Sequence, residues 1–321
     1  MKKIYNVCFS SHDEVLFRDE EDHARFINCY AHSLTRTESL SYCDVEMSDH
    51  GHYCIATDNL TCFSRSLHTS YSKYFNNKYK RHGRLGDHGY YAIEIYGLNH
   101  FLAAICYDLR NAVHHGVTPT PYMYPYSSVN CYFREALGKP LPKTRSMTKS
   151  DIRRTLPRYA KWSDAFVMDS SGVFLRDSFT ETRVVERHFA SARSFLYYMN
   201  RLSGEEWERL QSDDRRESPL ITLELIEMPM LTVKGTDTGS LLTRLKSNEY
   251  GRFSLPELDD MRLCSLIDHG YLSDFKASSI YELSTNDRIK IAADIRRKHR
   301  VSEAQLQRCL ILTDTSAWNR R

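Results

Sequence analysis

Two histidines separated by one residue, His50 and His52, stand in the run VEMSDHGHYCIAT, which has the composition of a β-strand. Strand side chains alternate between the two faces, so both imidazoles should leave the same face. Tyr107 and Asn111 are four residues apart in CYDLRNAVHHGVT, a run typical of a helix, so we expect them to stack on one face. Two imidazoles and an amide oxygen suit a divalent cation, and a nearby phenol is a potential nucleophile. The pattern favours metal-assisted attack on a phosphodiester.

Neither half of this pattern is specific by itself. The chain has 14 His and 21 Tyr, so a lone pair is more often structural and most tyrosines must be packing. Glu46 has the same strand parity as the histidines and is a candidate metal ligand or general base, although an edge-exposed carboxylate is the simpler interpretation. Asp49 and Asp108 neighbour the candidate ligands in sequence, but we leave both out of the catalytic set.

The order of several segments strengthens the pattern, because together they resemble the single-tyrosine HUH transposases, in particular the REP-associated tyrosine transposases. The matching segments are MSDHGHYCIAT, SLHTSYSKYFNNKYKRHG, YAIEIYG, CYDLRNAVHHGV and YPYSSVNCY, within residues 1 to 140. The chain departs from the family at Gly51, where a bulky hydrophobic residue is usual, and at Ala112, where a proline is common.

The resemblance implies a DNA transposase that cleaves and rejoins single strands at hairpin (REP-type, palindromic) sequences. His50, His52 and Asn111 would hold a divalent ion, Mg²⁺ or Mn²⁺. Tyr107 would attack the phosphodiester and form a 5′-phosphotyrosine intermediate with a free 3′ hydroxyl. Single-stranded or hairpin DNA is therefore the expected partner, and a homodimer is possible.

Two other functions stay open. One is a catalytically weak or inactive, domesticated nucleic-acid-binding protein that keeps the HUH fold, which Gly51 favours. The other is a replication initiator or relaxase, which shares the chemistry. The usual relaxase order places the tyrosine ahead of the histidines, and Tyr107 follows them here.

The first part of the chain predicts an α+β fold. Strands are expected at residues 4–9, 42–47, 53–56 and 90–96, and helices at 20–33, after an Asn59 cap, and after an Asn99 cap. The order β-α-β-β-α-β is that of a ferredoxin-like or RRM-like antiparallel sheet with helices on one face. The resemblance implies the same fold, as an HUH nuclease domain followed by a mainly helical carboxy-terminal region.

Three regions are expected along the chain. Residues 1–140 form the HUH single-tyrosine domain, 141–275 a mixed α/β or helical accessory region with a helix at 184–202, and 276–321 a helix-turn-helix-like region. Ser284 or Thr285 should cap the first helix of the last region, and Ser302 the second. Since every proposed catalytic residue precedes position 112, we expect cleavage of short strands to survive removal of the last helices.

Basic residues cluster in two runs, although the formal net charge of the whole chain is only +3. Such local excesses are typical of phosphate binding, and a solvated helix face is the alternative. The predicted DNA contacts are Arg65, Lys73, Lys78, Lys80, Arg81, Arg84, Arg296, Arg297, Lys298 and Arg300.

The remaining composition bounds the setting of the protein. Nine cysteines occur without C-x-x-C spacing, which excludes a zinc ribbon and fits a reducing compartment. The amino terminus lacks the apolar stretch of a signal peptide, and no apolar run reaches the roughly 18 residues of a membrane span. We therefore expect a cytoplasmic, nucleoid-associated protein that makes no use of a membrane.

Overall fold

The computed structural model describes residues 2–87, 89–146, 148, 150, 154–157, 160, 162–201, 204–212, 219–227 and 258–312. Its centre is a four-stranded antiparallel sheet with the strand order β2-β3-β1-β4. The elements that build and cover the sheet are β1 (Lys3–Ser10), α1 (Glu20–Arg36), β2 (Leu40–Glu46), β3 (His50–Thr57), α2 (Leu60–Tyr79), β4 (Tyr91–Ile95), α3 (Leu98–Leu109) and α4 (Asn111–His114).

This order confirms the predicted α+β arrangement of a four-stranded antiparallel sheet with helices, followed by further helices towards the carboxyl end. Asn59 caps α2 as expected, because its side-chain oxygen accepts a hydrogen bond from the Cys62 N–H at 2.9 Å. The cap predicted at Asn99 is wrong, since Gly97 occupies the N-cap position of α3 without a side-chain hydrogen bond. Its φ of +80° lies in the left-handed region that glycine adopts easily.

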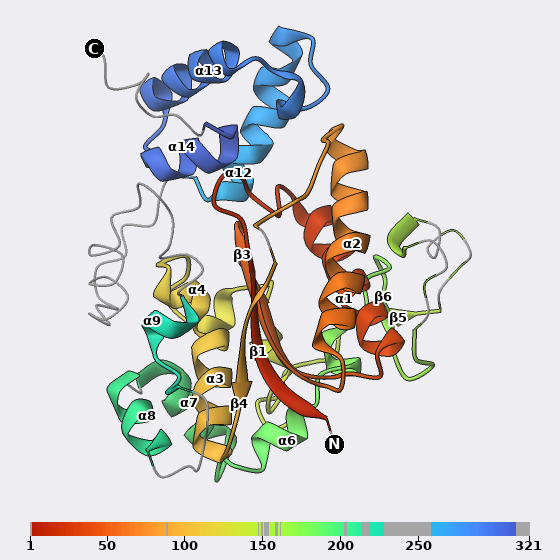
Figure 1. The fold of residues 1–321 in the computed structure, drawn as a ribbon, viewed down its shortest axis with the longest axis vertical. Coiled ribbons are helices and arrows are strands. Elements are labelled where there is room, and N and C mark those ends of the chain that lie inside the picture. The colour runs from red at the N-terminus through yellow and green to blue at the C-terminus, as the bar shows by residue number, and fades with distance from the viewer. Residues whose placement is uncertain are drawn as a thin grey trace.

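Helices cover both faces of the sheet, so the expectation of helices on one face is wrong. Helices α1 and α2 pack on one face, and α3 lies on the other (Figure 1). The physical reason is visible in β3, which is buried at every position. Tyr53 and Ile55 join the core under α1 and α2, whereas Cys54 and Ala56 join the core under α3. Both faces therefore need an apolar cover.

The middle region adds short elements on both faces of the sheet, since Met168 joins the core under α1 and α2 whereas Phe195 joins the core that contains α3. The helix predicted at 184–202 is two helices, because Ser191 begins a new one: its side chain accepts from the Ser194 N–H at 3.2 Å. Phe195 and Met199 of the second helix are buried in the core that contains α3. The bounds are β5 (Thr144–Arg145), β6 (Met168–Asp169), α6 (Thr182–Glu186), α7 (Ala192–Arg201), α8 (Gly204–Gln211) and α9 (Leu223–Ile226).

Residues 258–312 form a helical unit, called here the C-terminal module. The predicted caps are confirmed: Ser284 caps α13, and Ser302 caps α14 with a capping box completed by Gln305. The module has its own apolar core, which also takes in Val15 from the amino-terminal part of the chain. Its elements are α12 (Asp260–Leu266), a π-helical turn (Ile267–Tyr271), 3-10 turns at Leu272–Phe275 and Ile280–Glu282, α13 (Thr285–Lys298) and α14 (Glu303–Leu310).

A buried arginine joins this module to the sheet domain. Arg18 is 1% exposed and donates two hydrogen bonds to Asp268, at 2.7 and 3.0 Å, and one to the Cys309 carbonyl at 3.1 Å. Tyr281 of the module donates to Glu14 at 2.5 Å. These contacts argue against a module that can be removed without consequence for the rest. No helix among the described residues is long and apolar enough to cross a membrane.

Loss of the Arg18 contacts should destabilise the fold. Arg18→Met removes three hydrogen bonds of a buried guanidinium and leaves the half-buried Asp268 carboxylate without its partner, so we expect the free energy of unfolding to fall by about 3 kcal/mol, measured by urea denaturation. Lys290→Ala is the control, since Lys290 pairs with Asp287 on the surface. A denaturation midpoint for Arg18→Met equal to that of the control would contradict the structural role of Arg18.

Candidate metal centre

The register of the sheet places the two histidines side by side on the face covered by α3. His50 lies opposite Ser10 and His52 opposite Cys8 on the central strand β1. Both imidazoles are buried, with ring centroids 5.3 Å apart. The alternation of strand side chains thus brings the pair together beneath α3 and α4.

A carboxylate from the middle region completes a cluster with these histidines. His50, His52 and Glu227 each place one ligand atom within 4.8 Å of the other two, and all three residues are buried. Glu227 directly follows α9, far along the chain from β3. Glu227 was not predicted as a ligand, because nothing in the run LELIEMP relates it to His50, which lies far away in the sequence. The mixed imidazole and carboxylate set fits Mn²⁺ or another transition metal better than Mg²⁺, which prefers oxygen ligands.

Asn111 lies against this cluster, at the start of α4. Its side-chain oxygen lies 2.9 Å from His50 Nε2, and its amide nitrogen donates to Glu227 Oε1 at 2.6 Å. The amide therefore turns its oxygen towards the histidine pair. His115 Nε2 lies 3.0 Å from the second Glu227 oxygen, Oε2. His115 was not among the candidate ligands predicted from the sequence.

His52 has the environment of a metal ligand. Its side chain is 0% exposed, and neither ring nitrogen has a hydrogen-bond partner among the described residues. Burial lowers the pKa of His52 to about 3, so the ring is neutral and offers a lone pair. Its Nε2 lies 3.9 Å from Glu227 Oε1. Buried polar atoms nearly always find partners, and a cation between these two groups would supply one.

The other two members of the cluster are charged or strongly polarised. Burial alone would raise the pKa of Glu227, but the neighbouring His115, His52 and His50 hold that pKa well below its usual range. Burial alone would lower the pKa of His50, but its hydrogen bond to Asp49, at 2.8 Å, and the Asp49 charge raise it. A buried anionic carboxylate beside two imidazoles is a favourable setting for a divalent cation.

Asp108 lies next to the cluster on α3, with its Oδ1 3.9 Å from His52 Nδ1. Burial raises the pKa of Asp108 to about 7, against the lowering effect of its hydrogen bonds from Asn6 and Cys43. A carboxylate at that position can orient a ligating imidazole from its rear nitrogen. Asp108 is thus a neighbour of the candidate ligands.

Tyr107 and Asn111 do not belong to one continuous helix. Helix α3 ends at Leu109, and α4 begins only after Arg110, whose φ of −93° and ψ of 0° interrupt the helical geometry. The expectation of one helical face shared by both residues is therefore wrong. The Tyr107 side chain is 4% exposed within the core under α3, and its ring centroid lies 5.9 Å from that of His114. Its role as a nucleophile stays a prediction.

Glu46 faces away from the histidines. It lies opposite Gly51 in the β2–β3 pair, so its side chain points to the face of α1. There its Oε2 accepts from Arg176 at 2.6 Å, and Asp44 Oδ2 accepts from the same guanidinium at 2.6 Å. Strand parity misplaced Glu46 because residues 47–49 form a turn, across which alternation does not carry. Gly51 faces that side too, away from the metal cluster.

The six predicted DNA contacts of the first basic run differ in whether an internal ion pair uses their charge. Lys78 is bound to Asp19 and Asp22, and Arg81 to Glu14, so internal ion pairs use their charge. Lys80 ends α2 in a left-handed conformation, with a φ of 55°. The other three cations line a cavity of about 500 Å³ and have no ion-pair partner among the described residues. They are Arg65, Lys73 and Arg84.

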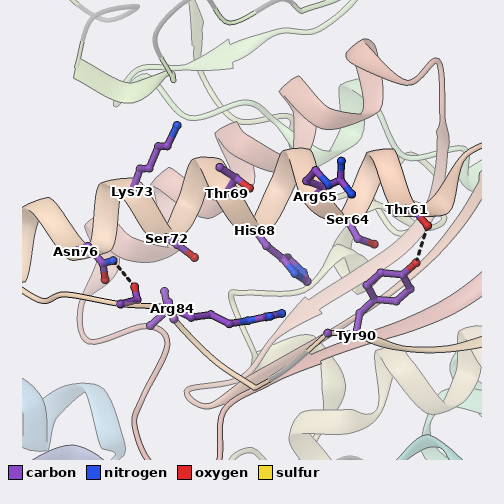
Figure 2. Close-up of a pocket in the computed structure, with 13 residues that line it drawn as sticks. Thr61, Ser64, Arg65, His68, Thr69, Ser72, Lys73, Asn76, Arg84 and Tyr90 are labelled. Atoms are coloured by element: carbon purple, nitrogen blue, oxygen red, sulfur yellow. Dashed lines mark hydrogen bonds between the residues drawn. The ribbon is translucent and has the colours of Figure 1, made fainter.

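This cavity lies between α2 and the segment before β4, and we call it the α2 groove. Figure 2 shows Arg84 reaching along it towards His68, while Lys73 and Arg65 project from the other side of α2. Tyr90 closes one end, with its hydroxyl 3.3 Å from that of Thr61. A groove with unpaired cations and hydroxyl groups suits a phosphate-bearing strand.

The cations of the second basic run are mostly paired within the C-terminal module. Arg296 binds Glu303 at 2.9 Å, and Arg297 and Lys298 bind Asp294 at 2.6 and 2.5 Å. Arg300 is exposed in the turn before α14. Surface pairs of this kind exchange readily with solvent, so DNA contact by these four residues stays a prediction.

Comparison with known proteins leaves the family of the chain open. No family model and no curated protein matches it. Among solved structures, it is similar to a REP-associated tyrosine transposase bound to a REP hairpin, at 10% identity and a TM-score of 0.37, over 46% of this chain and 91% of that chain. A likeness at this level carries no argument about fold or function.

Metal binding should stabilise the protein through the cluster. At about 100 times its Kd, Mn²⁺ should raise the free energy of unfolding by about 2.7 kcal/mol, and His52→Ala should abolish that gain because a ligand is lost. Thermal denaturation with and without Mn²⁺ measures both. His188→Ala, at an exposed histidine, is the control and should keep the full gain. Equal stabilisation of the His52→Ala protein would place the ion elsewhere.

Proposed function

We propose that this protein cleaves and rejoins single-stranded DNA in a metal-dependent reaction in which Tyr107 is the nucleophile, as in a transposase acting at hairpin sequences. The observation that carries the proposal is the buried cluster of His50, His52 and Glu227, with the Asn111 oxygen turned towards it. These groups supply what phosphodiester cleavage needs, namely a place for a cation beside the neutral imidazole of His52 and the buried carboxylate of Glu227.

The cluster residues and Tyr107 have different roles in the proposed reaction. A divalent ion bound by His50, His52 and an oxygen from Glu227 or Asn111 would polarise the scissile phosphate as a Lewis acid. The Tyr107 oxygen forms a bond to phosphorus as its proton leaves, and the bond from phosphorus to the 3′ oxygen breaks. That 3′ oxygen takes up a proton and becomes a free hydroxyl. The phosphotyrosine keeps the energy of the diester, so a second 3′ hydroxyl can reverse the step on a new partner.

Access to the centre depends on the segment that carries Glu227. The side chains of His50, His52, Asn111 and Glu227 are all at most 1% exposed. A DNA phosphate therefore reaches the cluster only when this segment moves aside. Glu227 is held by Asn111 and His115, and a phosphate oxygen can accept the same hydrogen bonds. A phosphodiester is thus a chemically matched replacement for this carboxylate.

The α2 groove is the proposed path of the DNA strand on the outside of the protein. Arg65, Lys73 and Arg84 offer positive charge there without internal partners among the described residues. Tyr90 and His68 offer flat rings beside them. Cations that follow a backbone, with rings on which bases can stack, are the common arrangement for single-stranded nucleic acid.

A second candidate function is a DNA-binding protein that keeps the fold but not the reaction. The position of Tyr107 favours it, since the side chain is packed in the core under α3 and the helix breaks before Asn111. The two functions share the groove and differ in whether a covalent bond to DNA forms. The variant at position 107 distinguishes them.

Tyr107→Phe should abolish a covalent protein–DNA adduct while leaving hairpin binding within about twofold, because only the nucleophilic oxygen is removed. The measurement is incubation of the protein with a labelled single-stranded hairpin and Mn²⁺, followed by denaturing electrophoresis. Tyr122→Phe is a matched control at a neighbouring partly buried tyrosine and should keep the adduct. An adduct that persists in Tyr107→Phe would move the nucleophile to another residue, and its absence from the unaltered protein would favour the second function.

Replacing Arg65 and Arg84 together by alanine should flatten the salt dependence of single-strand binding. Each lost phosphate contact lowers the slope of log affinity against log salt by about 0.7, so the double variant should lose about 1.4. Fluorescence anisotropy across a salt series gives the slope. Lys3→Ala is the control, since Lys3 pairs with Glu94 on β4 outside the groove. An unchanged slope in the double variant would exclude the α2 groove as the strand path.

A further inference from the structure

The turn that carries His50 is held by chain segments on both sides of it. Residues 47–49 join β2 to β3, and the Met47 N–H closes the turn on the His50 carbonyl at 2.7 Å. The Ser48 carbonyl accepts from the Leu16 N–H at 2.7 Å, and the Asp49 carbonyl accepts from the Ser11 N–H at 2.8 Å. The backbone of the turn is thus fixed from the β1–α1 connection. Its side chains are fixed from another direction.

Those side chains meet Asp260, the first residue of α12 in the C-terminal module. The Asp260 carboxylate is 7% exposed and accepts from Ser48 Oγ at 2.6 Å. It also accepts from Arg308 of α14 at 2.5 and 3.0 Å, and from Gln305 at 3.1 Å. A buried carboxylate with this many donors is rigidly held. It ties two helices of the module to the turn.

Arg308 extends this contact to a metal-ligand candidate. Its Nε lies 3.8 Å from Asp49 Oδ2, and the other Asp49 oxygen lies 2.8 Å from His50 Nδ1. The opposite ring nitrogen, Nε2, faces Asn111 and the cluster. A carboxylate on the rear nitrogen of a ligating histidine fixes its tautomer and ring orientation. The sequence of contacts therefore runs from the module through Asp49 to His50.

We propose that the C-terminal module is a working part of the metal centre: Asp260 and Arg308 are positioning residues that clamp the turn at 47–49 and so set the orientation of His50. The proposal rests on the proposed function for the role of His50 as a ligand. It gives the module a task different from DNA contact, and it explains why its buried carboxylate points at a turn and not at the surface.

The first test is the Mn²⁺ affinity of the full-length protein, measured by calorimetry. Loss of a direct outer partner of a ligating histidine typically costs about 10–100-fold in metal affinity, and Arg308 and Asp260 act one contact further out, so Arg308→Ala and Asp260→Asn should each weaken Mn²⁺ binding by up to about tenfold. Arg308→Lys keeps the charge without the planar fork and should fall between these variants and the unaltered protein. Unchanged affinity in Arg308→Ala and Asp260→Asn would overturn the proposal.

A destabilised control separates positioning from general loosening. Arg18→Met breaks other buried contacts of the same module, at Asp268 and at the Cys309 carbonyl, and removes no hydrogen bond to the turn or the cluster. It should lower the melting temperature and leave the Mn²⁺ affinity of the folded protein within about twofold. If Arg18→Met weakens Mn²⁺ binding as much as Arg308→Ala does, the module acts only through overall stability and the clamp is wrong.

A double-variant cycle tests whether Arg308 acts through Asp49. Asp49→Asn should itself weaken Mn²⁺ binding, and adding Arg308→Ala to it should cost little more, because the connection is already broken. If the losses of Mn²⁺ affinity in Asp49→Asn and Arg308→Ala multiply in the double variant, Arg308 affects metal binding independently of Asp49, and the proposed series of contacts is overturned.

A measurement on the metal-free protein tests whether Arg308 orients His50, independently of metal binding. The imidazole nitrogen signals of His50 in NMR spectra of the metal-free protein report its tautomer and its hydrogen bond to Asp49. Arg308→Ala should shift these signals, whereas Arg18→Met should leave them unchanged. If the unaltered protein does not bind Mn²⁺, the proposed metal-dependent function is wrong, but the comparison of His50 signals between the variants still tests the positioning role of Arg308. Unchanged His50 signals in Arg308→Ala would remove the clamp.

Discussion

The arrangement of the site depends on one buried carboxylate. Glu227 is 0% exposed, yet the imidazoles around it hold its pKa low, so an anion sits in the interior. An uncompensated buried charge is costly, and here the compensation comes from His115 and Asn111 and, on our proposal, from a cation shared with His50 and His52. Glu227, which directly follows α9, is the one residue of that segment that joins the site among those described, and its hydrogen-bond partners there are Asn111 and His115.

The sheet separates two polar networks that the sequence interleaves. Asp44 and Glu46 bind Arg176 on the face of α1, whereas His50 and His52 face α3. Each network is packed against the apolar core on its own side of the sheet. The charged groups of one network therefore form their ion pairs within that network. The turn at residues 47–49 makes this separation possible, because it resets the side-chain alternation between β2 and β3. Gly51 belongs to the side away from the histidines, and its small size therefore bears on β2 packing, with Val45 O 3.3 Å from where a Cβ would lie.

Local patterns in the sequence predicted what is local in the structure. The strands, the helix caps at Asn59, Ser284 and Ser302 and the pairing of His50 with His52 follow from alternation and capping chemistry, which act over a few residues. Glu227, by contrast, reaches the cluster through tertiary packing, which no spacing in one sequence encodes. The break at Arg110 was missed for a related reason, since CYDLRNAVHH contains neither Gly nor Pro to announce it. Placement of α3 on the second face was missed because a βαββαβ order does not say which face a following helix covers.

Segments distant in sequence converge on the same hairpin. Its strand β3 carries the histidines, Glu227 comes from beyond α9, and Asp260 and Arg308 come from the C-terminal module. A site assembled in this way exists only when the whole chain has folded, because each segment contributes groups that are buried and polar and need the others as partners. The amino-terminal sheet domain by itself would expose Ser48 and Asp49 to water and leave His50 without its fixed neighbour. The candidate metal centre is therefore a property of the complete arrangement of sheet, middle region and module, and not of the segment that carries the histidines.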